Sequence, residues 1–363
     1  MSIVLTLLVF TFIVVVHEGG HFLMARRCGI FVEEFSVGMG PILLKHRTKK
    51  DLLVSLRLLP IGGFCRMKGE EPDPENPDKV PDPDSFTGVS VGKRALVVAA
   101  GPVMNFILAF VLLLIFNMLL GYTSRQVASV DETYPAAEAG LQAGDTVIGL
   151  NGESVHVYGK ISFLLMNYRE GETVSLKVRH EDGTKDTLTF PLKFDEELQR
   201  YRMGFTVSPR GSLSEEIGAR GFFPALGEVI AESFWYTGYE IEVTIRSLGM
   251  LLTGKVGIDA LTGPIGMVSI VGDTYEEAVH YGFLTTLASL SSIVILISAN
   301  LGVLNLFPIP GLDGSRLVFL GLEKIRKKPL DPRVENVIYI VGFVLLFGLM
   351  IAVAFNDILR LVR

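Results

Sequence analysis

Four stretches of apolar residues without an acidic or basic side chain divide the chain. They are Ser2–Val16, Ala95–Ser124, Gly282–Leu312 and Asn336–Asn356. The last three contain 30, 31 and 21 residues, and a helix needs roughly 20 apolar residues to cross the hydrocarbon core of a bilayer. The pattern therefore predicts three membrane-spanning helices and leaves the shorter first stretch to be interpreted.

The first stretch has two readings, a cleaved signal peptide or a retained helix. A signal peptide begins with basic residues, whereas Met1–Ile3 contains none. The apolar pattern also continues through His17-Glu18-Gly19-Gly20-His21 to Ala25. Residues 3–25 would measure about 34 Å as a helix at 1.5 Å per residue. We therefore expect a retained helix with polar residues inside the membrane, and four spans in all.

The segments that join these spans differ in their content of Lys and Arg. Residues 26–94 carry 12 of them and residues 316–335 carry six, whereas none precedes the first span. Cytoplasmic loops are enriched in Lys and Arg, so we expect both loops in the cytoplasm, with both termini and residues 125–281 outside. Arg360 and Arg363, at the expected outer end, run against this rule.

The composition supports a membrane protein and excludes other classes. Of 363 residues, 49% are hydrophobic and 20% are charged, and the mean hydropathy is +0.44. The apolar content excludes a disordered chain, and two cysteines, Cys28 and Cys65, are too few for a disulfide scaffold. A net charge of -6 without a long basic run argues against nucleic acid as a partner.

The first loop begins with alternating apolar residues and then becomes acidic. Residues 52–64 alternate and are interrupted by Gly62-Gly63, which predicts a small β-hairpin or sheet. Residues 70–85 are rich in Pro and acidic side chains, which predicts an exposed irregular loop.

A segment of soluble composition follows the second span. In residues 125–208, a short helix, a Gly-Asp turn, a β-branched strand and an Asn-Gly turn fit Ala136–Gly152. A second helix over 158–168 and strands over 172–180 and 186–192 complete the pattern. The stretch resembles the signature of a PDZ domain. PDZ domains commonly hold an extended peptide by strand addition, and the alternative is a domain that serves only as a steric cap.

Residues 213–262 carry apolar side chains at helical spacing, interrupted by acidic residues. They fit one or two amphipathic helices on the outer membrane surface. The alternative is a helix that packs on the PDZ domain.

The sequence His17-Glu18-Gly19-Gly20-His21 is an H-E-x-x-H motif. Residues four apart lie on one face of a helix, so both imidazoles can reach one zinc ion, with Glu18 between them as general base. Because two histidines and a carboxylate inside an apolar helix cost several kcal/mol without a partner or function, their position favours a metal site over a satisfied core.

A catalytic zinc site has three protein ligands and one open position. Asp313 is the first acidic residue after the third apolar stretch, in Asn305-Leu306-Phe307-Pro308-Ile309-Pro310-Gly311-Leu312-Asp313-Gly314. The prolines and glycines prevent a regular helix there, and broken backbone at membrane depth is tolerated where it lines a cavity. Asp313 is therefore either the third ligand or the cap of a following helix.

These two motifs resemble the site-2 protease family of intramembrane zinc metalloproteases, and in particular its bacterial RseP/RasP type with a single PDZ domain. Three further elements resemble that family, namely Gly101-Pro102-Val103-Met104-Asn105, Thr262–Gly266 and the glycine-containing segments Val37–Pro41 and Gly62–Phe64. The resemblance covers nearly the whole chain, in the order of the family.

The resemblance implies a role for each residue of the site. His17, His21 and Asp313 would bind Zn²⁺, and Glu18 would be the general base. Asn305 would hold the substrate strand or stabilise the oxyanion. The two glycines of the motif weaken an isolated helix by about 1 kcal/mol each relative to Ala, which questions its regularity at the site.

The expected fold is a membrane α-helical protein with about four transmembrane helices, a membrane-associated β-region and an inserted extracytoplasmic PDZ (α+β) domain. The expected segments follow the chain: 1–30 first span, 31–92 cytoplasmic β-region and acidic loop, 93–122 second span, 123–208 PDZ domain, 209–281 amphipathic helices, 282–315 third span, 316–333 cytoplasmic loop and 334–360 fourth span.

The expected function is hydrolysis of peptide bonds within the transmembrane segment of single-span membrane proteins, such as anti-sigma factors or signal-peptide remnants. An upstream site-1-type protease would trim them first, and the PDZ domain would exclude untrimmed proteins. The expected location is the bacterial cell membrane, with the active site toward the cytoplasm. The alternative functions are a catalytically silent PDZ adaptor in the membrane and a metal transporter. An adaptor would need neither Glu18 nor Asp313, and a transporter would more often show an internal repeat.

Overall fold

The computed structural model describes residues 1–70, 82–166, 172–196, 200–257 and 261–362. Most of the acidic loop expected at 70–85 lies outside the described residues. The chain forms two compact units. One combines Met1–Ala109 with Thr244–Arg363, and the other is Phe110–Val243.

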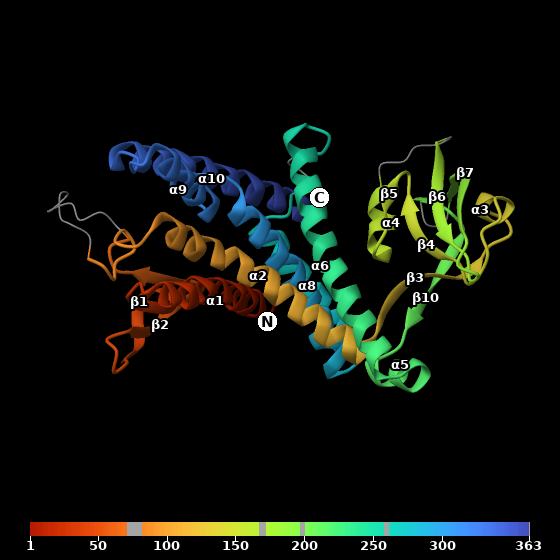
Figure 1. The fold of residues 1–363 in the computed structure, drawn as a ribbon, viewed down its shortest axis with the longest axis horizontal. Helices are drawn as coiled ribbons and strands as arrows, with labels where there is room; N and C mark the ends of the chain where they lie inside the picture. Colours follow the sequence, from red (N-terminus) through yellow and green to blue (C-terminus); the bar gives the residue numbers. More distant parts are fainter. Residues whose placement is uncertain (71–81, 167–171, 197–199, 258–260, 363) are drawn as a thin grey trace. The chain divides into compact units, whose positions relative to one another are not determined.

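Helices dominate the first unit. It contains α1 (Ser2–Cys28), the start of α2 (Val91–Leu120), the end of α6 (Phe222–Leu252), α7 (Pro264–Val279), α8 (Phe283–Leu306), α9 (Asp313–Arg326) and α10 (Pro332–Val362) (Figure 1). Among the described residues, four helices are long and apolar enough to cross a membrane, namely α1, α2, α8 and Arg333–Arg360 of α10. The prediction of four long apolar helices is confirmed.

Helix α1 is continuous through the two glycines of the H-E-x-x-H motif. It ends at Gly29, whose φ of 84° is the left-handed conformation typical of a helix C-terminus. The two glycines therefore do not interrupt the helix at the motif. Gly20 has a packing role, because an added Cβ would lie 2.3 Å from the backbone oxygen of Ala100 on α2.

The membrane-associated β-region is a small, strongly bent sheet. It consists of β1 (Val32–Arg47) and β2 (Leu53–Met67). Residues 32–37 pair with 63–67 on one side and with 53–56 on the other, while 42–47 pair with 53–57 next to the turn. Residues 63–67 therefore lie at one edge of this sheet. The bends are made by glycines with positive φ, including Gly38 and Gly62.

The sheet runs along α1. At one end the Thr11 hydroxyl donates to the carbonyl oxygen of Pro60 at 2.5 Å, and toward the other end the rings of Phe22 and Phe35 meet edge to face, 5.4 Å apart. Contacts at both places show that the glycine bends lie beside the middle of α1 and the β1–β2 turn lies toward its C-terminal end.

The second unit contains a PDZ-like domain. Its strands are β3 (Tyr122–Val130), β4 (Thr146–Leu150), β5 (Glu153–Ser154), β6 (Thr173–Arg179), β7 (Lys185–Pro191), β8 (Lys193–Asp195), β9 (Arg200–Arg202) and β10 (Phe205–Arg210). One sheet has the order β10-β3-β4-β6-β7, with β5 paired to β4, and β8 pairs with β9 separately. Helices α3 (Pro135–Glu138), α4 (Tyr158–Leu165) and α5 (Leu213–Arg220) complete the unit (Figure 1).

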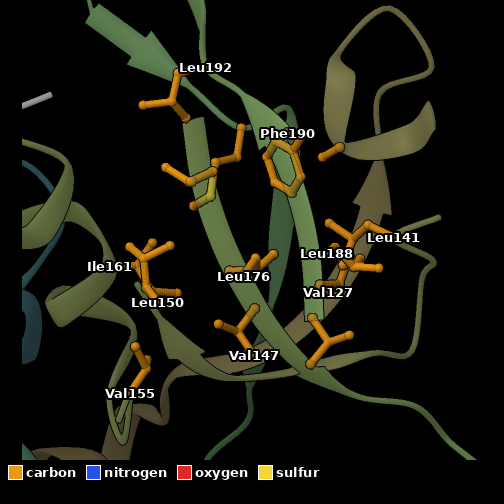
Figure 2. Close-up of a cluster of buried hydrophobic side chains, with 14 residues drawn as sticks. Val127, Leu141, Val147, Leu150, Val155, Ile161, Leu176, Leu188, Phe190 and Leu192 are labelled. Atoms are coloured by element: carbon orange, nitrogen blue, oxygen red, sulfur yellow. The ribbon is translucent and has the colours of Figure 1, made fainter. Parts of the chain in front are cut away.

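A single apolar cluster supports this domain. Figure 2 shows side chains of β4, β6, β7 and α4 that meet in it, and Val147, Leu150 and Leu176 are fully buried. The predicted Asn-Gly turn joins β4 to β5, since Asn151 and Gly152 both have positive φ. The expectation of a PDZ-like domain is confirmed.

The N-terminal part of α6 packs in part on the PDZ-like domain. The imidazole of His156 stacks on Trp235 with ring centroids 3.8 Å apart, and the Tyr239 hydroxyl donates to the carbonyl oxygen of Gly159 at 3.1 Å. Phe223 and Phe234 nevertheless stay exposed. The helix thus combines packing on the domain with an exposed apolar surface.

Candidate metal centre

Two histidines on one face of α1 form the base of the site. His17 and His21 are both buried, and their Nε2 atoms lie 3.2 Å apart. The spacing of four residues places them one turn apart on the side of α1 that meets α2. The structure therefore brings the two imidazoles together as the motif predicts.

Asp313 reaches these histidines from the other end of the chain. Its Oδ2 atom lies 3.1 Å from Nε2 of His17 and 3.3 Å from Nε2 of His21. One ligand atom from each residue lies within 4.8 Å of the others, which fits a single metal ion. Asp313 is the first residue of α9, whose N-cap is Leu312 and has no side-chain capping bond, so the geometry favours the ligand interpretation over the cap.

The backbone before Asp313 explains how it turns toward α1. Helix α8 ends at Leu306, because Phe307 is extended before Pro308. Gly314 then packs so closely that an added Cβ would lie 2.1 Å from the carbonyl oxygen of Phe307. The Leu-Asp-Gly sequence is therefore required for a tight turn that presents the carboxylate of Asp313.

Glu18 faces the centre and the sheet at once. Its carboxylate lies near His17, His21 and Asp313 and accepts a hydrogen bond from the backbone N–H of Cys65. Cys65 belongs to the edge segment 63–67 of the sheet. Glu18 thus lies between the ligand cluster and the edge segment 63–67 of the sheet.

Partners on α2 orient both imidazoles. The Nδ1 of His21 lies 2.9 Å from the carbonyl oxygen of Val97, so it donates a proton there and leaves the lone pair of Nε2 for the centre. The Nδ1 of His17 lies 3.2 Å from the side-chain amide of Asn105, which is fully buried.

The amide of Asn105 can be assigned from its surroundings. With Nδ2 toward His17, Oδ1 is buried without a hydrogen-bond partner among the described residues. The two amide atoms are distinguished only by their hydrogen bonds. Turning the amide lets Oδ1 accept the Nδ1 proton of His17, so that Nε2 of this ring is also a free acceptor.

The acceptor atoms of His17, His21 and Asp313 converge in a way that fits a bound cation. Two neutral imidazoles and a carboxylate direct lone pairs at one another over 3.1–3.3 Å. Three converging acceptors of this type fit a divalent metal with nitrogen and oxygen ligands.

Gly101 of α2 completes the pocket for the imidazoles. A Cβ at this position would lie 2.3 Å from Nε2 of His21 and 2.8 Å from Cε1 of His17. Only a hydrogen atom fits there. The sequence element Gly101–Asn105 therefore supplies both the space for the histidines and a partner for one of them. The sequence alone assigned no role to Gly101 or Asn105. The resemblance of Gly101–Asn105 to a family motif was the signal that pointed to this segment.

Asn305 lies beside the centre. It is in the last turn of α8, and its Nδ2 is 3.5 Å from Nε2 of His17. The structure therefore places all five residues singled out from the sequence around one point, and adds Val97, Asn105, Gly101 and the backbone of Cys65.

Comparison with known proteins agrees with this arrangement. The sequence model of peptidase family M50 matches residues 5–349. A protein of Clostridium acetobutylicum is 34% identical over 358 residues, which cover 98% of this chain and 97% of the relative. The zinc metalloprotease RasP of Shouchella clausii is 32% identical over 435 residues and covers 97% of both chains. RasP of Geobacillus kaustophilus is 28% identical over 442 residues, covering 98% and 97%.

Among solved structures, the PDZ domain of the SdrC-like protein from Listeria monocytogenes covers 24% of this chain and 88% of its own, with 23% identity and a TM-score of 0.22. The full-length relatives and the family match confirm the resemblance seen in the motifs. The chain belongs to peptidase family M50 and is a multi-pass membrane zinc metalloprotease.

Proposed function

We propose that this protein hydrolyses peptide bonds inside the transmembrane segment of single-span membrane proteins. One observation carries the proposal. His17, Glu18 and His21 lie within α1, an apolar helix of 27 residues, at roughly 22–28 Å from its first residue by a rise of 1.5 Å per residue. A soluble substrate would not reach a site at this depth, whereas a membrane helix would.

In this proposal His17, His21 and Asp313 hold Zn²⁺, and Val97 and Asn105 fix the orientation of the two rings. When bound, zinc polarises the scissile carbonyl group and makes water a nucleophile near neutral pH. Glu18 takes the proton from the attacking water and passes it to the leaving amine. The N–H of Cys65 holds the carboxylate of Glu18 in place for both transfers.

Asn305 has a separate role in the proposal. Its side-chain amide lies close enough to His17 to donate a hydrogen bond to the carbonyl oxygen of the substrate. Such a donor stabilises the negative charge that develops on that oxygen. Asn305 would therefore act on the substrate, whereas Asn105 would act on a ligand.

The substrate must be extended at the cleavage point, because a helical amide is hydrogen-bonded and hidden. The edge segment 63–67 offers a partner, since it pairs with 32–37 and with no other strand in the described part of the chain, and it lies next to Glu18. An unwound substrate strand would add to this edge by backbone hydrogen bonds. Its scissile bond would then lie beside the metal centre.

We further propose that the active site faces the cytoplasm and the PDZ-like domain lies outside, where it excludes proteins with large outer domains. The excess of Lys and Arg in residues 26–94 and 316–335 supports this orientation. Substrates would then be proteins already trimmed by another protease, such as anti-sigma factors or signal-peptide remnants.

Mapping of the cleaved bond tests the proposed reaction. The purified protein is incubated with a labelled single-span substrate, and mass spectrometry identifies the new termini. We expect them inside the apolar segment of the substrate. New termini confined to the soluble parts of the substrate would contradict intramembrane cleavage.

A deletion tests the size filter. An added Cβ at Gly121 would lie 2.7 Å from the backbone oxygen of Gly211, so Tyr122–Arg210 can be excised and the two glycines joined. We expect the shortened protein to cut untrimmed substrates that the full chain leaves intact. If it still cuts only trimmed substrates, the filter role is wrong, while the proposed chemistry stands.

A further inference from the structure

A cavity of about 600 Å³ lies at the C-terminal end of α1, apart from the metal centre. One wall is formed by Phe22, Arg26 and Ile30, at the end of α1 and just after it. The opposite wall includes Lys49 and Lys50, from the turn that joins β1 to β2. The cavity thus lies between the helix that carries the histidines and the sheet that contacts Glu18.

The walls of this cavity are positively charged. Arg26, Lys49 and Lys50 form no ion pair with a residue that the structure describes. The acid that lines the cavity, Asp84, is bound by Lys68, whose Nζ lies 2.7 Å from Oδ1. Three basic side chains therefore remain available for an anionic ligand.

The same cavity has an apolar side. Phe22 and Ile30 line it together with Phe31, Val32 and Leu52. The guanidinium of Arg26 lies 5.6 Å from the centre of the Phe22 ring, which keeps the cation at the boundary between the two kinds of surface. A ligand with an anionic group and an apolar body satisfies both.

The position of the cavity along α1 identifies the class of ligand. The bends of the sheet lie beside Thr11, and the strands near them expose large apolar side chains such as Met39, Leu58 and Leu59. Arg26 is 15 residues further along α1, or roughly 22 Å. The cavity therefore lies where an apolar surface ends and basic residues begin, at the level expected for phospholipid headgroups.

We propose that this cavity binds the phosphodiester headgroup of an anionic phospholipid, with Arg26, Lys49 and Lys50 on the phosphate and the apolar wall along the first part of the acyl chains. The bound lipid would join the end of α1 to the β1–β2 turn. The ring of Phe22, which lines the cavity, packs on Phe35, and Phe35 pairs with Cys65, so the lipid would also stabilise the sheet edge beside Glu18. This second effect rests on the proposed function, whereas lipid binding does not.

Binding is tested on the full chain with Glu18→Gln, so that catalysis plays no part. Purified protein in detergent is titrated with fluorescent phosphatidylglycerol, with phosphatidylcholine and inorganic phosphate as competitors. The cavity variant combines Arg26→Gln, Lys49→Ser and Lys50→Ser. The matched control removes three basic charges from the end of α9 and the following residues by Lys324→Ser, Lys327→Ser and Lys328→Ser.

We expect the cavity variant to bind phosphatidylglycerol at least tenfold more weakly, and the control variant to change by less than threefold. Phosphatidylcholine and millimolar phosphate should compete poorly. Equal losses in both variants would show non-specific attraction and overturn the site. Full competition by inorganic phosphate would identify a free anion as the ligand and overturn the lipid. Unchanged unfolding temperatures verify that both variants are folded.

Discussion

Asp313 and His17 are 296 residues apart in the chain, and Oδ2 of the first lies 3.1 Å from Nε2 of the second. A carboxylate oxygen and an imidazole lone pair repel each other at this distance unless a cation or a proton lies between them. We predict that Asp313→Asn lowers zinc affinity by more than the roughly 10–100-fold cost of removing an outer partner. Metal content after dialysis against a weak chelator measures this. Asp273→Asn, on the exposed face of α7, should retain zinc, and equal retention by both variants would contradict the assignment.

Asn105 provides a test of the orientation of His17. Asn105→Ala removes the acceptor for the Nδ1 proton, so we expect zinc affinity to fall by about 10–100-fold. Asn105→Asp keeps an oxygen at this position and should restore most of the affinity. Asn117→Ala, which removes a half-buried amide of α2 that donates to Ser233, is the control. A loss that Asn105→Asp does not restore would indicate a purely structural role.

Gly101 and Gly92 lie on the same helix and differ in their surroundings. A Cβ at Gly101 would collide with His21, whereas none of the described atoms approaches within 4 Å at Gly92. We predict that Gly101→Ala displaces the histidines and abolishes zinc binding and cleavage, while Gly92→Ala leaves both unchanged. Zinc bound at full stoichiometry by Gly101→Ala would show that the imidazoles lie elsewhere.

The PDZ-like domain contains a pH-dependent pair. Nδ1 of His180 donates to Oδ1 of the buried Asp145 at 2.7 Å, and this hydrogen bond raises the pKa of His180 above its ordinary 6.5. Because the folded state has the higher pKa, the pair stabilises the domain fully below pH 6.5. The stabilisation is lost as the pH rises through the raised value.

We therefore expect the difference in unfolding temperature between the wild type and His180→Gln to be largest below pH 6.5 and to shrink as the pH rises further. Trp235 is the single tryptophan of the chain and lies in the same unit, so its fluorescence reports the transition. A difference that grows with pH would show that the pKa of His180 is not raised.

The elements that the sequence predicts well are those with a local signal. Four long apolar stretches become four long helices, and the Gly-Asp and Asn-Gly turns of the PDZ-like domain are where their residues require them. His17 and His21 share a face because the spacing of four residues is fixed by helix geometry. In each case the residues that determine the structure are close to one another in the sequence.

The contacts between distant segments could not be predicted in this way. Residues 32–37 pair with 63–67 on one side and with 53–56 on the other because both strands bend. The alternation of apolar residues predicts strands but does not predict where they bend. Asn105 and Gly101 act through packing of α2 on α1, which no periodicity encodes. The motif Gly101–Asn105 indicated that the segment matters, but its contact with the histidines needed the three-dimensional structure.

The most direct test of the account is cleavage of a labelled single-span membrane protein by the wild type and by Glu18→Gln, with zinc content measured in both. The account predicts that both proteins bind one zinc ion and that the variant is slower by about 10²–10⁴-fold, the usual contribution of a general base. Equal cleavage by the two proteins would contradict the proposed mechanism, because the proton would then be taken by another group.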